Sequence, residues 1–98
     1  MVASEERMKS LLADADYAVT GERMMDYGTP KVNYQRIAEL WNDYLNPPDP
    51  LTPIDVAILM ILTKVARLME SPEHYDTWKD IAGYAAVGWA LTGEPSND

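Results

Sequence analysis

Four charged residues in the second half of the chain are spaced so that they could meet. Lys64 and Arg67 are the only charges in residues 56–69. Asp76 and Asp80 follow a few positions later. At 1.5 Å per residue, the two cations lie about 4.5 Å apart along a helix axis and the two carboxylates about 6 Å apart. If a short turn joins two antiparallel helices here, the pairs fall at matching heights.

These four residues, called the charged quartet below, have two interpretations. In the first, they form a structural ion-pair network between two core helices, with Tyr84 as a further hydrogen-bond partner, because charges inside a protein are generally paired. In the second, they line a polar pocket. There the cations would hold a phosphate or carboxylate, and Asp76 and Asp80 would bind Mg²⁺ or a sugar hydroxyl.

Other polar residues could extend such a pocket. His74 is the only histidine, and it is either a general base or metal ligand or a half-exposed surface residue. Asn33 and Arg36 are one turn apart at a predicted helix N-terminus, which attracts anions. Tyr27 precedes them in the connector. These three could complete a ligand site, or they could cap the turn.

Apolar periodicity and capping signals predict four helices that position these residues. The first spans 4–20, the second 32–45 and the third 53–70, and the fourth runs from the break at Ser71-Pro72 to about Leu91. Three prolines in residues 46–50 end the second helix, and Thr52 with Asp55 predicts a capping box for the third. The predicted fold is therefore all-α, a compact bundle of about four helices with the last two as an antiparallel hairpin. We expect one domain, 1–92, and a flexible tail, 93–98.

Glycines and large apolar residues in these helices suggest close contacts. Gly83 and Gly88 each cost about 1 kcal/mol in a helix interior, which suggests that a neighbouring helix or a ligand comes close to them. The three tryptophans are expected in the core or at a subunit interface. Met24-Met25 suggests a contact surface in the first connector.

Composition limits the classes of function. The 98 residues carry a net charge of −8, which disfavours binding to a nucleic-acid backbone or an anionic membrane. The chain has no cysteine, so a disulfide framework or thiolate metal site is excluded. The longest apolar stretch is seven residues, whereas a membrane span needs about 20. We therefore expect a cytoplasmic protein, within the host cell if a phage encodes it. Its apolar surplus suggests that the chain binds a partner.

Several short motifs follow one pattern. They are Tyr27-Gly28-Thr29-Pro30 with Asn33, then 36–41, 51–53, 55–57 and 64–68, His74 with Asp76, and 80–84. This pattern resembles a family of small domains of unknown function common in phages of actinobacteria, and it covers about 26–86. That family is distantly similar to phage nucleotide-modification-associated domains and to the all-helical MazG-like nucleotide pyrophosphohydrolases. The resemblance implies a self-associating helical bundle and a nucleotide ligand, with the charged quartet matching the family's polar motif.

One departure from the pyrophosphohydrolases bears on catalysis. Those enzymes bind Mg²⁺ through ExxE and ExxD motifs, whereas this chain has carboxylates at four-residue spacing and two cations beside them. The cations would repel a metal ion, so binding is favoured over hydrolysis, and the question of an enzyme stays open. The first hypothesis is a phage-type helical protein that binds a nucleotide or another phosphate metabolite between helices. The alternative is a non-enzymatic oligomer that binds a host protein, in which the quartet is purely structural.

Overall fold

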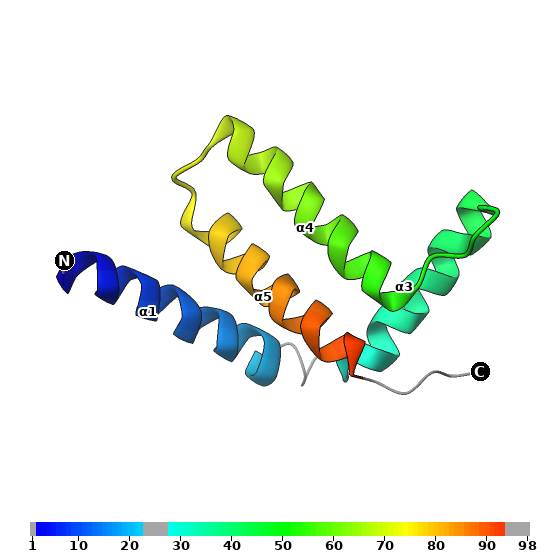
Figure 1. The fold of residues 1–98 in the computed structure, drawn as a ribbon, viewed down its shortest axis with the longest axis horizontal. Coiled ribbons are helices and arrows are strands. Elements are labelled where there is room, and N and C mark those ends of the chain that lie inside the picture. Colours follow the sequence, from blue (N-terminus) through cyan, green and yellow to red (C-terminus); the bar gives the residue numbers. More distant parts are fainter. Residues whose placement is uncertain (1, 23–27, 94–98) are drawn as a thin grey trace.

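A computed structural model describes residues 2–22 and 28–93, and every regular element in this part of the chain is a helix (Figure 1). The elements are α1 (Val2–Tyr17), the π-helix η1 (Ala18–Glu22), α3 (Pro30–Leu45), α4 (Pro53–Glu70) and α5 (Tyr75–Thr92). The all-α prediction is confirmed. None of the described helices is long and apolar enough to cross a membrane.

The hairpin of α4 and α5 forms the centre of the molecule (Figure 1). The predicted capping box begins α4, since the Thr52 N–H donates to Asp55 Oδ2 at 2.9 Å and the Asp55 N–H donates to Thr52 Oγ1 at 3.3 Å. The predicted start of the last helix after Ser71-Pro72 is a few residues early. The Ser71 N–H closes α4 on Arg67 O, and its carbonyl accepts from His74 N–H. Residues 72–74 are therefore used in the turn.

Glycines allow α5 to approach its neighbours closely, as predicted. A Cβ on Gly88 would lie 3.3 Å from the Ala57 Cβ of α4. A Cβ on Gly83 would lie 3.1 Å from Val19 Cγ1 of η1. Both contacts are with protein, so packing accounts for the two helix-interior glycines.

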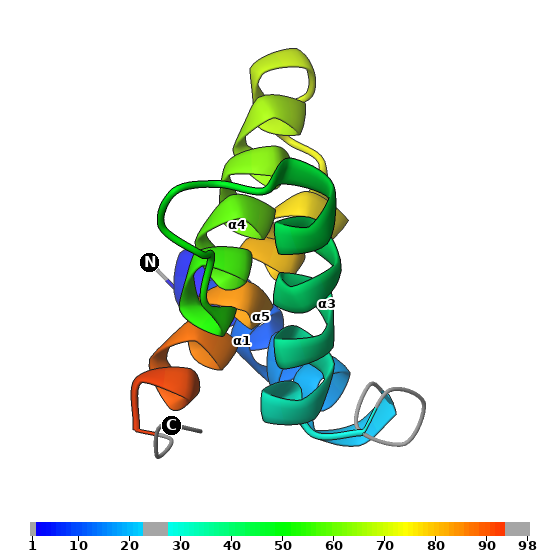
Figure 2. The same cartoon turned by 90° about the vertical axis from the view of Figure 1, so that its right-hand side faces the viewer.

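The core lies where α3 crosses the α4–α5 hairpin (Figure 2). Its buried members are Tyr34, Ala38, Val56, Ala57, Val87 and Leu91. The α3 helix begins at Pro30, two residues before the predicted start, because Thr29 caps it and proline suits its first turn. Asn42 ties the proline-rich connector to α3, since its side chain bonds both the N–H and the carbonyl of Leu51, at 2.7 and 3.0 Å.

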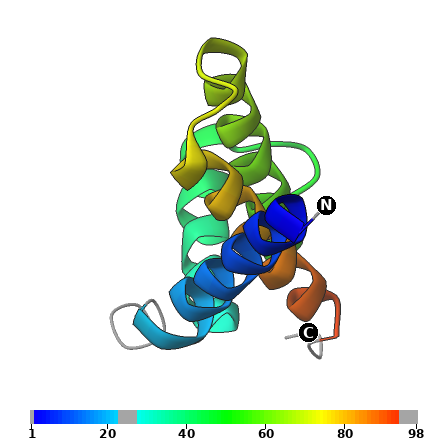
Figure 3. The same cartoon turned by 90° about the vertical axis from the view of Figure 1, so that its left-hand side faces the viewer.

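The N-terminal helix α1 lies along α5, on the opposite side from α4 (Figures 1 and 3). The α-helix ends at Tyr17, and the chain continues as η1 through Gly21 to Glu22. An apolar stripe along α1 consists of Met8, Leu11, Leu12 and Ala15. In the described part of α1 only Ala15 is buried, while Met8 and Leu12 are exposed.

The tryptophans divide between the core and the surface. Trp41 packs against the core, but Trp78 and Trp89 are exposed, so the core interpretation is wrong for these two. Met24, Met25 and Tyr27 lie outside the described residues, as do the last five residues of the predicted tail.

Candidate functional site

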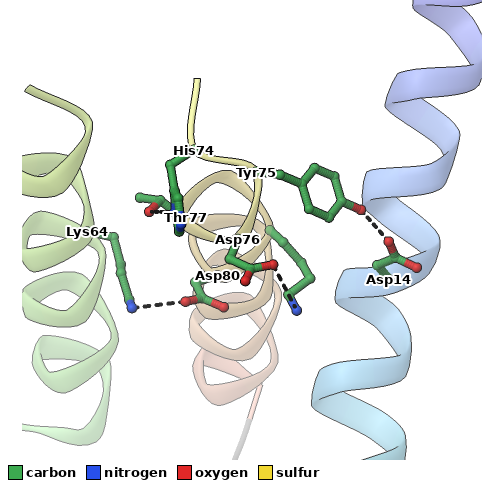
Figure 4. Close-up of polar contacts among 8 residues, drawn as sticks. Asp14, Lys64, His74, Tyr75, Asp76, Thr77 and Asp80 are labelled. Atoms are coloured by element: carbon green, nitrogen blue, oxygen red, sulfur yellow. Dashed lines mark hydrogen bonds and ion pairs between the residues drawn. The ribbon is translucent and has the colours of Figure 1, made fainter. Parts of the chain in front are cut away.

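The antiparallel hairpin brings one cation of the charged quartet against one carboxylate. Lys64 Nζ of α4 lies 2.9 Å from Asp80 Oδ2 of α5 (Figure 4). The Lys64 side chain is 18% exposed and that of Asp80 36% exposed, so solvent reaches this pair. The matching heights expected from helical rise therefore produce one interhelical ion pair.

The other two members of the quartet do not meet. Asp76 lies 3.7 Å from Lys79, one turn along the same helix, and points away from α4 (Figure 4). Arg67 is exposed, and no ion pair joins it to Asp76. The expectation that all four residues meet is wrong, because the rotation of each helix about its axis directs Lys64 and Asp80 into the interface and leaves Arg67 and Asp76 exposed.

His74 and Tyr84, which precede and follow Asp80 in the chain, lie in different surroundings. His74 Nδ1 shares a 2.8 Å hydrogen bond with Thr77 Oγ1, and Thr77 is almost fully buried, so the contact orders the first turn of α5 (Figure 4). Tyr84 lines a cavity of about 40 Å³ with Asp80 and Lys79 beneath η1. A volume of this size holds about one water molecule and is far too small for a nucleotide.

The residues predicted to close the pocket lie elsewhere or outside the described part. Arg36 lines a separate surface hollow on α3 with Lys31 and Glu39, and neither Lys64 nor Asp80 contributes to it. Asn33 is half-buried, and its N–H donates to Thr29 O in the first turn of α3. Tyr27 lies outside the described residues. A single site built from Asn33, Arg36 and the quartet is therefore not formed.

The carboxylates that the structure describes do not form a metal centre. In residues 2–22 and 28–93, no three His, Asp or Glu side chains converge in a way that could hold a metal ion. Asp76 and Asp80, the candidate Mg²⁺ ligands, each lie beside a lysine. Because Mg²⁺ requires several oxygen ligands and is repelled by nearby cations, this donor set does not fit the ion.

A second polar contact, which the sequence reasoning missed, joins α1 to α5. The Tyr75 hydroxyl donates to the Asp14 carboxylate across the two helices (Figure 4). This hydrogen bond raises the pKa of Tyr75 above its ordinary value, and partial desolvation and the charges of Asp14 and Asp76 add to the effect. The two residues are 61 positions apart, so only the packing of α1 on α5 reveals the contact.

The same contact borders a groove of about 1070 Å³ between α1 and the start of α5. Its apolar and aromatic lining comprises Met8, Leu11, Pro72, Tyr75 and Trp78. Trp78 Nε1 donates to Pro72 O at 2.7 Å, which fixes the indole at the groove. A signal for this site is present in the sequence, since Tyr75 and Trp78 lie one turn apart on the same face.

The protein is therefore a domain built around a helical hairpin, and its polar residues are spread over several helices. Residues 10–92 match the family described as "Domain of unknown function (DUF6378)", and the chain belongs to this family. It is 50% identical over 78 residues to the Gene 55 protein of Mycobacterium phage L5. It is 40% identical over 87 residues to the Gene 55 protein of Mycobacterium phage D29.

These alignments cover 80% and 89% of the present chain but only 49% and 56% of the phage L5 and D29 proteins. The chain therefore spans about half the length of both relatives. No solved structure matches it. The predicted phage-related family of unknown function is confirmed, whereas similarity to the MazG-like pyrophosphohydrolases stays a prediction.

Proposed function

We propose that this chain is a non-enzymatic protein-binding module that takes a helix of a host protein in the groove between α1 and the start of α5. The observation that carries the proposal is the groove's exposed apolar and aromatic wall, formed by Met8, Leu11, Tyr75 and Trp78. The Lys64–Asp80 pair then has the structural role of joining α4 to α5. Because similar proteins are encoded by phages, the partner that we propose is a host protein.

The aromatic wall suits binding because it is ordered without a partner. Hydrogen bonds to Asp14 and to the Pro72 carbonyl fix Tyr75 and Trp78, respectively. Side chains that are already ordered lose less conformational entropy on binding. Tyrosine and tryptophan also contribute a large share of the binding energy in many protein interfaces.

The dimensions and charge of the groove indicate the kind of partner. The lining of α1 extends from Ala3 to Asp14, about 16 Å or three helical turns. Its charged residues are Glu6, Asp14 and Glu73 against the single cation Arg7. An amphipathic helix with an apolar stripe and basic flanks would match this surface in shape and charge.

Selection from a library of displayed helical peptides tests the proposal. We expect the selected peptides to be amphipathic and basic. We expect Trp78→Ala to weaken their binding by about tenfold or more, as for an interface anchor. Trp89→Ala is the matched control, because Trp89 is exposed on the same helix but does not line the groove. No selected peptides, or peptides whose binding ignores Trp78, would contradict the proposal.

The host protein that binds the groove can then be identified with the same two variants, Trp78→Ala and Trp89→Ala. A pull-down from host lysate should retain a protein on the wild type and on Trp89→Ala and lose it on Trp78→Ala. A protein that all three chains retain equally would bind elsewhere and would not support the groove.

A second candidate is the binding of a nucleotide or another phosphate metabolite near Lys64 and Arg67. The observation in its favour is that Arg67 is exposed beside Lys64, with no carboxylate paired to it among the described ion pairs. A thermal-shift screen of nucleotides with and without Mg²⁺ tests it. If a ligand binds at this place, it should raise the melting temperature of the wild type. It should not raise that of the double variant Lys64→Ala/Arg67→Ala, which must itself be folded. If ligand at about 1 mM causes no shift in melting temperature, nucleotide binding at this place is excluded. A dissociation constant of about 1 mM corresponds to a binding free energy of about 4 kcal/mol.

A further inference from the structure

The outer side of α4 carries an apolar surface separate from the groove. Its members, called the α4 face, are Ile54, Ile58, Leu62, Val65 and Met69, and each is more than a third exposed. At about 100° per residue they lie within an arc of about 80° that contains no charged residue. The contacts of α4 with α5 and α3 use its other sides, through residues such as Lys64, Val56 and Ala57. We propose that two copies of this chain associate through the α4 face, as an antiparallel pair with two-fold symmetry.

The spacing of this face makes it complementary to itself. Ile58, Leu62, Val65 and Met69 are separated by four, three and four residues, which is the spacing of a coiled-coil seam. The series 4-3-4 reads the same from either end. In an antiparallel pair, Ile58 of one copy therefore lies opposite Met69 of the other, and Leu62 lies opposite Val65. These four residues are therefore matched in two pairs, as a symmetric interface requires, while Ile54 lies at the end of the seam with no α4 residue opposite it.

The accessible area supports an interface of dimer size. The α4 face accounts for on the order of 500 Å² of apolar surface, near the upper limit for patches on monomers. A stable interface buries about 800 Å² per partner, which this face and its flanks can supply.

The net charge of the chain opposes this pairing only at long range. Each chain has a net charge of −8, so two copies repel each other over long range. Pairing through an uncharged seam adds no buried charge and places the opposed helix dipoles side by side. The groove lies on the other side of α5 from α4, so both grooves of the pair stay accessible (Figure 1). The inference does not depend on the proposed peptide binding.

Sedimentation of the wild type and two lysine variants tests the pairing. Leu62 is 56% exposed and Leu40 on α3 is 61% exposed, so Leu62→Lys and Leu40→Lys are matched in residue, exposure and charge change. We expect a dimer for the wild type and for Leu40→Lys. We expect Leu62→Lys to weaken dimerisation by about tenfold or more, roughly 1.4 kcal/mol. Since the added lysine lowers the net negative charge, long-range repulsion cannot cause that loss.

Circular dichroism must show the same helix content in all three proteins. Met69→Glu is a second variant, because its 85% exposed side chain contributes little to the fold of one chain. A wild type that stays monomeric at high protein concentration overturns the inference. So does a dimer that Leu62→Lys and Met69→Glu leave intact, or an assembly that Leu40→Lys disperses.

Cysteine cross-linking tests the antiparallel arrangement. The chain has no cysteine, so introduced thiols form the only possible disulfides. Ile58→Cys mixed with Met69→Cys should form a disulfide-linked heterodimer on mild oxidation. Ile58→Cys alone should not, because its two copies lie about 16 Å apart along the paired helices. Efficient cross-linking of Ile58→Cys alone would indicate a parallel pair and overturn the arrangement.

Discussion

Tyr75 and Asp14 form a hydrogen bond whose strength should depend on pH. The neutral Tyr75 hydroxyl donates to the Asp14 carboxylate, whereas a phenolate would lose this donor and be repelled by Asp14 and Asp76. The pKa of Tyr75 is therefore raised in the folded protein relative to its unfolded value of about 10. A raised folded pKa means that the contribution to stability is complete below pH of about 10 and is lost as pH rises through the folded pKa.

We predict that Tyr75→Phe lowers the melting temperature at neutral pH and that its difference from the wild type disappears at alkaline pH. Thermal unfolding followed by circular dichroism over a pH series measures this. Tyr44→Phe is the control, because Tyr44 is exposed on α3 and makes no contact with α1. A difference between wild type and Tyr75→Phe that stays constant through the alkaline range would refute the assignment.

The Lys64–Asp80 pair should contribute only modestly to stability. Both side chains reach solvent, and exposed ion pairs contribute between about 0 and 1 kcal/mol. A double-mutant cycle with Lys64→Met and Asp80→Asn, measured by urea unfolding, should give a coupling of about 0.5 kcal/mol. The matching cycle with Arg67→Met and Asp76→Asn should give none, since these residues are not paired. Equal coupling energies in both cycles would show instead that all four residues interact as a network.

At the residue scale, the sequence predicted how far along each helix a side chain lies but not the direction in which it points from the helix axis. Helical rise correctly placed Lys64 level with Asp80, because the rise per residue is the same in every α-helix and the start of α5 was misplaced by only a few residues. The rotation of each helix about its axis depends on packing with all its neighbours, which the sequence does not specify. That rotation turned Arg67 and Asp76 to solvent. It also placed Tyr75 against Asp14, a contact that no local pattern encodes.

At the scale of elements, the close packing of α4 on α5 depends on Gly88. Its missing Cβ leaves room for Ala57, whose own Cβ would be 3.3 Å away and has no rotatable bond with which to move. Alanine gains about 1 kcal/mol of helix propensity over glycine. Overpacking in a core costs about 1–3 kcal/mol. We predict that Gly88→Ala lowers the free energy of unfolding by about 1 kcal/mol, because the two helices must separate.

A cycle with Ala57→Gly checks the cause of that loss. If steric contact is responsible, the double variant should lose less stability than the sum of the two single variants. Chemical denaturation of the four proteins measures the coupling. A Gly88→Ala protein that is more stable than the wild type would show that the helices adjust and that propensity dominates.

Element boundaries were predicted best where capping chemistry is local. Thr52, Pro53 and Asp55 define the start of α4 within four residues, and the predicted helix 53–70 agrees with the structure. The apolar stripe of α1 was a different case. A stripe shows that a helix face avoids water, but it does not distinguish burial in the same chain from burial by a partner. In α1, Met8 and Leu12 are exposed, and Met8 and Leu11 line the groove.

At the scale of the whole molecule, two apolar surfaces lie on opposite sides of α5 and differ in their electrostatics. The groove between α1 and α5 has an acidic rim, so a basic peptide should be attracted to it. The α4 face is uncharged and lies on a chain of net charge −8, so its pairing is opposed by long-range repulsion. Screening by salt should therefore act on the two surfaces in opposite directions.

We predict that raising NaCl from about 50 mM to about 500 mM strengthens self-association and weakens basic-peptide binding, because the Debye length shortens severalfold over this range. Sedimentation equilibrium measures the first and fluorescence anisotropy of a labelled peptide the second. The Leu62→Lys variant serves for the peptide titration, since a monomer separates the two equilibria. Dimerisation that weakens with salt would mean that ion pairs, rather than the uncharged seam of α4, hold the copies together. Peptide binding that does not change with salt would show that the acidic rim does not contribute to recognition of the partner.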